Sequence, residues 1–142
     1  MTAYLKTVPA LPAGEITRRE SAVIEAGKLA DGVIAGDAVT YDSATATFKK
    51  FAGTGTPYGV VTRIVPESPD YDGMAGILVH GYVTVTVAAG DPVRGAKVYL
   101  TAAGGYSATS TSNTEFPNAI WAVDGKSDGN LAEIRILQLK GI

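Results

Sequence analysis

Side chains that could do chemistry are few and stand far apart along the sequence. The 142 residues include no cysteine and a single histidine, His80. Disulfides, thiolate metal sites, cysteine nucleophiles and sites that need two imidazoles are therefore excluded. His80 has no serine or aspartate near it in the sequence that would indicate a catalytic triad. The carboxylates are scattered, and no pair is singled out for acid–base work. We expect no enzyme activity, no metal site and no cofactor.

One segment resembles the end of a phosphate-binding loop, Gly125-Lys126-Ser127. Ile120 stands where the first glycine of that motif belongs, and Asp128-Gly129-Asn130 follows where a helix should begin. Asp124 and Asp128 share this stretch but lack the carboxylate spacing of an EF-hand calcium loop. The segment is predicted to be a polar hairpin turn.

The charge balance excludes a further class of partner. Twelve Lys and Arg residues against 14 Asp and Glu give a net charge of −2, and the basic residues form no stripe. We therefore expect neither nucleic acid nor a membrane as a partner. With no visible secretory leader or membrane-spanning run, the sequence predicts a soluble protein made in the cytoplasm. Because only 18% of the residues are charged, the surface is expected to be partly covered by other subunits.

The pattern from residue 20 onward is typical of β-structure. Short runs rich in Thr, Val and Ile alternate with clusters of Gly, Asp, Asn and Pro. In the clearest run, 77–88, one face carries Ile77, Val79, Val83, Val85 and Val87, and the other carries Leu78, His80, Tyr82, Thr84 and Thr86. Gly81 interrupts the Val row and predicts a bend or a bulge. We expect an all-β fold, either a small β-barrel or a β-sandwich.

A short internal repeat suggests two related β-modules. Gly36-Asp37-Ala38-Val39 recurs as Gly90-Asp91-Pro92-Val93, 54 positions later, and each copy precedes a strand–turn–strand pattern. We place the modules at about residues 20–65 and 76–139 of a single β domain, 20–142. Residues 66–73 between them have the composition of a loop, with Tyr71 at the centre.

Residues 1–19 are predicted to form an extended N-terminal arm, because Pro9 and Pro12 disfavour a helix. The arm is more apolar than a disordered tail usually is. Its apolar residues are Tyr4, Leu5, Val8, Leu11 and Ile16. Such a segment either frays or docks on the body of the protein or on a partner.

Three stretches of the sequence resemble the head decoration, or structural cement, proteins of tailed bacteriophages. The first runs from Pro12-Ala-Gly-Glu-Ile16 through Arg18-Arg-Glu20 to Ile24-Glu-Ala-Gly27. The second joins Gly81-Tyr-Val-Thr-Val85 to Gly90-Asp-Pro-Val-Arg-Gly-Ala-Lys-Val-Tyr99. The third joins Pro117-Asn-Ala-Ile-Trp121 to Leu131-Ala-Glu-Ile-Arg-Ile136. Together they span most of the chain.

The resemblance implies a self-associating β-barrel or β-sandwich that clamps neighbouring major capsid proteins on the outer surface of the virion. A homotrimer is favoured, and a dimer is the alternative. We expect capsid contacts from Tyr4, Leu5, Val8, Leu11, Ile16 and Tyr71, and self-association through Leu78 and Tyr82. Deletion of residues 1–16 should then abolish capsid binding and leave the body folded.

Two other classes of function remain open. One is a carbohydrate-binding or adhesin-like β domain of a phage tail or fibre, which would present exposed aromatic side chains on loops. The apolar neighbours of Trp121 indicate a core position, which weighs against it. The other is a small β-barrel enzyme, for which catalytic residues are lacking. Glycan binding or substrate turnover by the isolated protein would distinguish these classes.

Overall fold

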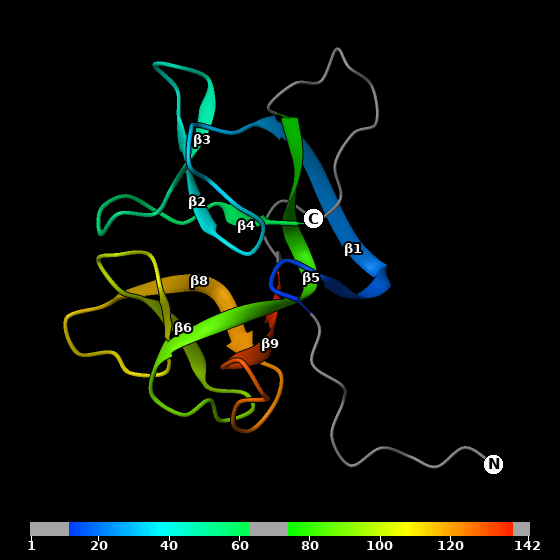
Figure 1. The fold of residues 1–142 in the computed structure, drawn as a ribbon, viewed down its shortest axis with the longest axis vertical. Helices are drawn as coiled ribbons and strands as arrows, with labels where there is room; N and C mark the ends of the chain where they lie inside the picture. Colours follow the sequence, from blue (N-terminus) through cyan, green and yellow to red (C-terminus); the bar gives the residue numbers. More distant parts are fainter. Residues whose placement is uncertain (1–11, 63–73, 138–142) are drawn as a thin grey trace.

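The computed structural model describes residues 12–62 and 74–137, with only the backbone for residues 19–21 (Figure 1). This part of the chain is all β, as predicted, and contains no helix. Consequently, no helix in it has the length and hydropathy of a membrane span. The strands are β1 (Ile16–Lys28), β2 (Ala38–Asp42), β3 (Thr47–Lys50), β4 (Gly59–Val61), β5 (Met74–Ala89), β6 (Lys97–Leu100), β7 (Tyr106–Ser107), β8 (Thr114–Trp121) and β9 (Leu131–Ile136).

The strands form two units that share β5, and this long strand runs from one lobe of the molecule into the other (Figure 1). The first half of β5 pairs with β4 and with most of β1, and its second half pairs with β9, with β7 and with the start of β1. In the second unit the pairings close a five-stranded barrel in the order β5–β7–β6–β8–β9. The second module predicted from residue 76 therefore includes strand residues that pair within the first unit.

The two units have the same topology. β2 pairs with β3 and β4, as β6 pairs with β7 and β8. β4 pairs with β5 as β8 pairs with β9, and β1 pairs with β5 as β5 pairs with β9. A parallel contact completes each unit: β5 with β7 in the second, and the bridge between Leu29 and Phe48 in the first. β5 is thus the last strand of one unit and the first strand of the next.

Backbone hydrogen bonds establish the spacing of this repeat. The Gly36 N–H donates to the Val61 carbonyl oxygen at 2.7 Å, and the Gly95 N–H donates to the Trp121 carbonyl oxygen at 2.8 Å. Gly36 is therefore equivalent to Gly95, 59 positions later in the sequence. The equivalence of Gly36 with Gly90 that the sequence repeat predicts is therefore wrong by five residues. It relied on the shared Gly-Asp dipeptide, whereas the backbone conserves the turn that precedes β2 and β6.

Strand β5 changes its facing at Gly81, where φ is +129° and favours glycine. Before this residue, Ile77 and Val79 pack in one apolar cluster and Leu78 packs in another. After it, Val83 and the valines that follow at odd positions belong to the cluster of Leu78. The predicted bend is therefore present, but the prediction of a continuous Val row on a single face was wrong.

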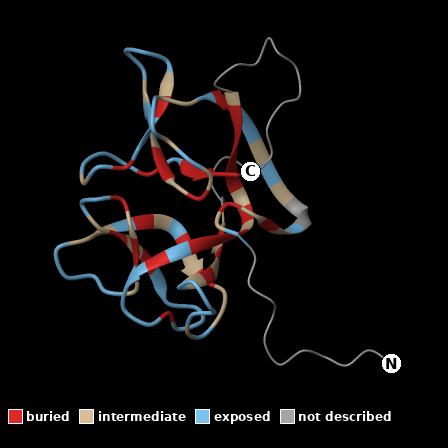
Figure 2. Cartoon of the chain, viewed as in Figure 1, coloured by how far each residue is buried: buried red, intermediate tan, exposed pale blue. Residues whose placement is uncertain are grey.

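The larger apolar cluster extends through both units (Figure 2). Its largest fully buried side chains, Trp121, Phe51 and Phe116, come from both sides of β5 in the sequence. Trp121 is in the core, as its apolar neighbours predicted. Because one packed cluster connects the units, we expect them to unfold together rather than one after the other.

Candidate functional site

Within the described residues, the side chains that could do chemistry are dispersed over the fold. Within residues 12–62 and 74–137, no group of three or more His, Cys, Asp or Glu side chains is placed to hold a metal ion. Half-buried His80 lies in β5, where its backbone is paired with Val23 of β1. Gly125-Lys126-Ser127 lies in the turn between β8 and β9, and Ser127 forms a bridge to Leu131. The structure therefore has the expected polar turn at this position and not a phosphate-binding loop.

The base of the N-terminal arm is fixed on the body of the protein. The Gly14 N–H donates to the Thr84 carbonyl oxygen at 2.8 Å. The Thr84 N–H donates in turn to the Glu15 carbonyl oxygen at 3.0 Å. Gly14 has φ +84°, and a Cβ atom there would lie 2.8 Å from the Gly36 nitrogen and 2.9 Å from the Ala35 Cβ. A side chain at this position would therefore displace the base of the arm.

The predicted capsid-contact residues fall into two groups. Tyr4, Leu5, Val8, Leu11 and Tyr71 lie outside the described residues. Ile16 lies in β1, opposite Val83, and is 7% exposed in the larger apolar cluster. Its side chain therefore stabilises the body and is not available to a partner. The arm also ends earlier than predicted, because Ile16–Lys28 is already paired as β1.

The predicted self-association pair is divided by the structure. Leu78 is fully buried between the units and offers no surface to a second copy. Its burial follows from the change of facing at Gly81, which turns Leu78 toward the same cluster as Val83. Tyr82 is half-buried on β5 and is reachable from solvent.

Tyr82 of β5 lies among charged side chains of two other strands, β1 and β9. The Arg18 guanidinium is 4.2 Å from the centre of the Tyr82 ring, and the Arg135 guanidinium is 5.8 Å from it. Arg135 Nη1 also donates to the Tyr82 hydroxyl oxygen at 3.3 Å, and Arg18 lies 3.9 Å from a carboxylate oxygen of Glu133. Cation–π contacts of this kind contribute about 0.5–1 kcal/mol at exposed sites. The cluster joins β1, β5 and β9 at the surface.

An aromatic cluster on the first unit was missed by sequence reasoning. Phe48 of β3 contacts Tyr41 and Tyr58, with ring centres 5.1 Å and 5.0 Å apart. Tyr41 and Tyr58 are exposed, and the Tyr58 hydroxyl donates to the Glu25 carboxylate of β1. Tyr41 and Phe48 are directly paired across the β2–β3 hairpin, so correct hairpin pairing would have revealed this contact.

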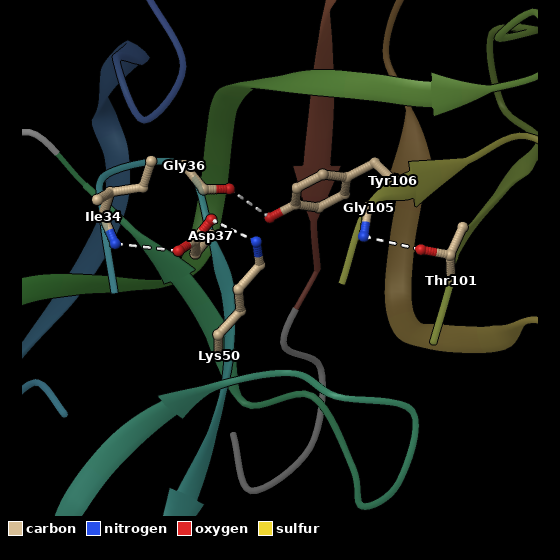
Figure 3. A network of polar contacts seen from close by, with 7 residues as sticks. All are labelled: Ile34, Gly36, Asp37, Lys50, Thr101, Gly105 and Tyr106. Atoms are coloured by element: carbon tan, nitrogen blue, oxygen red, sulfur yellow. Dashed lines mark hydrogen bonds and ion pairs between the residues drawn. The ribbon is translucent and has the colours of Figure 1, made fainter. Parts of the chain in front are cut away.

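A polar network connects the second unit to the turn before β2 (Figure 3). The buried Tyr106 hydroxyl donates to the Gly36 carbonyl oxygen at 2.8 Å. Beside it, Asp37 accepts a hydrogen bond from the Ile34 N–H at 3.0 Å and lies 3.7 Å from Lys50 Nζ. These contacts connect the Ile34–Asp37 turn to both units.

Two tyrosines make stability sensitive to alkaline pH. Burial raises the pKa of Tyr106 well above its ordinary value of 10.0, and the Asp37 carboxylate adds to the shift. The hydrogen bond to Glu25, with burial, raises the pKa of Tyr58 to about 12. Above pH 10 the unfolded chain releases these protons while the folded chain retains them, so the free energy of unfolding should fall as the pH rises.

Urea unfolding between pH 8 and 11.5 measures this effect. We expect constant stability up to about pH 10, a decline above it, and a shallower decline in Tyr106→Phe. Tyr99→Phe, at a half-buried tyrosine of β6, is the matched control and should follow the parent protein. Identical slopes for the parent and Tyr106→Phe would contradict the assignment.

The architecture and the site together define a class of protein. Two β-units with one topology share a strand, and the part that the structure describes gathers no metal-ligand cluster but fixes an apolar arm at its base. The class that this architecture defines is a two-unit all-β module with a shared central strand.

Comparisons with known proteins identify the family. The model of the XM1 gp53 minor capsid protein family matches residues 1–136, and the chain belongs to this family. A solved chain from "The capsid of Myoviridae Phage XM1" matches with a TM-score of 0.72 and 22% sequence identity over 96% of each chain, which shows a shared fold. No curated protein matches the sequence. The protein is a structural component of a phage virion that associates with the capsid.

Proposed function

We propose that the protein binds the outer surface of the capsid and stabilises the shell by linking neighbouring major capsid proteins, without enzymatic activity. Membership of a minor capsid protein family supports the association with the shell. The fixed base of the arm is the observation that supports the further part of the proposal, the linking of neighbouring subunits. Exposed Pro12 begins a segment whose Gly14 and Glu15 are bonded to Thr84 of β5. The point at which residues 1–11 join the folded body is therefore fixed.

The arm offers a way to strengthen the shell with weak individual contacts. Each apolar side chain that it buries against a capsid subunit gains about 25 cal/mol per Å² of area, less the cost of ordering the segment. Two contacts that one chain makes with neighbouring subunits are linked, so the second contact forms at a high effective concentration. Binding that favours the assembled shell stabilises it by mass action. Many copies on one capsid add these gains.

Self-association is a further part of the proposal. A homotrimer is favoured, and a dimer is the alternative. With Leu78 buried, Tyr82 is the remaining candidate from the predicted pair, and the Arg18 and Arg135 side chains around it would take part in the same contact.

The exposed aromatic cluster favours a second candidate function, binding of a carbohydrate. Tyr41 and Tyr58 present exposed rings, and the Glu25 carboxylate beside Tyr58 is a hydrogen-bond acceptor for sugar hydroxyls. Binding to a glycan array that is lost in a Tyr41→Ala, Tyr58→Ala double variant would support this function. Absence of glycan binding by the parent protein would eliminate it.

Shells that lack the protein provide the test of the main proposal. Purified protein is mixed with such shells, bound protein is counted after sedimentation, and the melting temperature of the shells is measured. We expect saturable binding and a higher melting temperature of the decorated shells. Binding without any rise in the melting temperature would contradict the stabilising role, and absence of binding would reject the proposal.

A further inference from the structure

The two units present equivalent turns. In the first, the Asp37 N–H donates to the Ile34 carbonyl oxygen at 3.1 Å, and Gly36 between them has φ +94°. In the second, the Ala96 N–H donates to the Val93 carbonyl oxygen at 2.9 Å, and Gly95 has φ +87°. A positive φ at the third residue is the signature of a type II turn. Ile34 and Val93 therefore occupy the same first position, 59 residues apart.

These two positions also share an unusual exposure. Ile34 is 67% exposed and Val93 is 58% exposed, the highest values for large apolar side chains in the ranges 12–62 and 74–137. A single exposed apolar residue needs no explanation. Here, however, an apolar side chain is exposed at the same position of both units, which a chance exposure of one residue does not explain. Folding does not require it, because neither side chain is buried in the core.

Both turns are stabilised by hydrogen bonds in addition to the one that closes each turn. The Ile34 N–H is bonded to the Asp37 carboxylate at 3.0 Å, and the Arg94 N–H is bonded to the Asp124 carboxylate at 2.8 Å. The Gly36 and Gly95 N–H groups are bonded to the ends of β4 and β8. Contact with a partner therefore requires little further ordering of either turn.

We propose that Ile34 and Val93 are paired anchors, each of which inserts into the same kind of apolar depression on one of two neighbouring copies of a capsid protein. This inference rests on the proposed function and specifies the side chains that make the link. A capsid repeats one subunit surface many times, so it offers the same depression at regular spacing. A chain that presents the same turn twice is complementary to such a surface.

The position of the arm agrees with this assignment. Gly14 lies against Ala35 and Gly36, so the base of the arm adjoins the first anchor. The arm and Ile34 would thus belong to one contact surface. Val93 follows β5 in the sequence and belongs to the second unit. Loss of one anchor would leave the protein bound to one subunit, without the link to the next.

The test compares Ile34→Asp, Val93→Asp and the double variant in the full chain. Binding to shells that lack the protein and the melting temperature of the shells are both measured. Burial of one Val or Ile side chain corresponds to roughly a tenfold to hundredfold change in affinity. We expect each single variant to weaken binding by at least about tenfold and to abolish the rise in shell melting temperature, and the double variant to bind weakest.

Val23→Asp is the matched control, because Val23 is 51% exposed on β1 and belongs to neither turn. It should bind as the parent does. Circular dichroism and thermal melting of each variant verify its fold, and Ile34→Ser and Val93→Ser replace any variant that fails this check.

Each other result overturns the inference. If only one of the two substitutions weakens binding, the anchors are not paired. If Val23→Asp weakens binding equally, the turns have no special role. If the parent protein binds and stabilises shells and the double variant does so equally, the anchors are refuted while the proposed function survives. A parent protein that fails to bind refutes the proposed function itself.

Discussion

Removal of residues 1–11 should reduce binding to capsid shells by about a hundredfold or more and leave the body folded. The removed segment contains Tyr4, Leu5, Val8 and Leu11, and burial of any two such side chains accounts for an effect of this size. The cut must end before Pro12. Deletion of residues 1–16 would also remove buried Ile16 and the hydrogen bonds of Gly14 and Glu15 to β5, so lost binding could then reflect a damaged fold.

Sedimentation with shells measures the binding, and thermal melting of the free protein verifies the fold. A second variant keeps the full length and changes Tyr4, Leu5, Val8 and Leu11 to Ser, and we expect it to match the truncation. Its control changes the polar arm residues Thr2 and Thr7 to Ala and should bind as the parent does. Binding by the truncated protein within twofold of the parent would show that the arm is not the contact.

Trp121→Ala should destabilise the whole protein by about 3–5 kcal/mol, which corresponds to a fall in melting temperature of roughly 10–15 °C. Trp121 is fully buried at the end of β8, in the cluster that extends through both units. Its indole N–H has no hydrogen-bond partner among the described residues, so the loss is one of packing. The Trp121 backbone is also hydrogen-bonded to Gly95 and Ala96 of the second anchor turn.

Calorimetry of the free protein tests this expectation. A single transition should move to lower temperature without splitting, because the shared strand and the shared cluster couple the units. Trp121→Phe retains an aromatic ring and removes the unpaired N–H, so it should cost clearly less. Two separated transitions, or a loss below about 1 kcal/mol, would contradict the description of one apolar cluster that couples the two units.

Local pattern predicted the fold class well, since alternation and turn residues are properties of neighbouring positions. The run 77–88 is a strand, Gly81 does interrupt it, and Trp121 is buried. The facing of Leu78 could not be predicted in the same way. It depends on a backbone torsion at Gly81 and on the fact that β5 belongs to two units, so both of its faces are covered before the bend.

The repeat shows a second limit of sequence reasoning. Gly36-Asp37 matches Gly90-Asp91 in letters, but Gly36 is structurally equivalent to Gly95. Both glycines have a positive φ in the turn before a strand, and their N–H groups donate to the last residues of β4 and β8. A turn of this kind constrains one residue to be glycine and leaves its neighbours free. The exposed positions Ile34 and Val93 become equivalent only in that register, so the sequence alone does not reveal their equivalence.

Image reconstruction of shells decorated with the purified protein tests the central claim most directly. We predict density on the outer surface, with the body and arm of each copy contacting two neighbouring major capsid proteins. Density on the inner surface, or a copy that contacts one capsid protein alone, would contradict the claim that the protein links subunits to strengthen the shell.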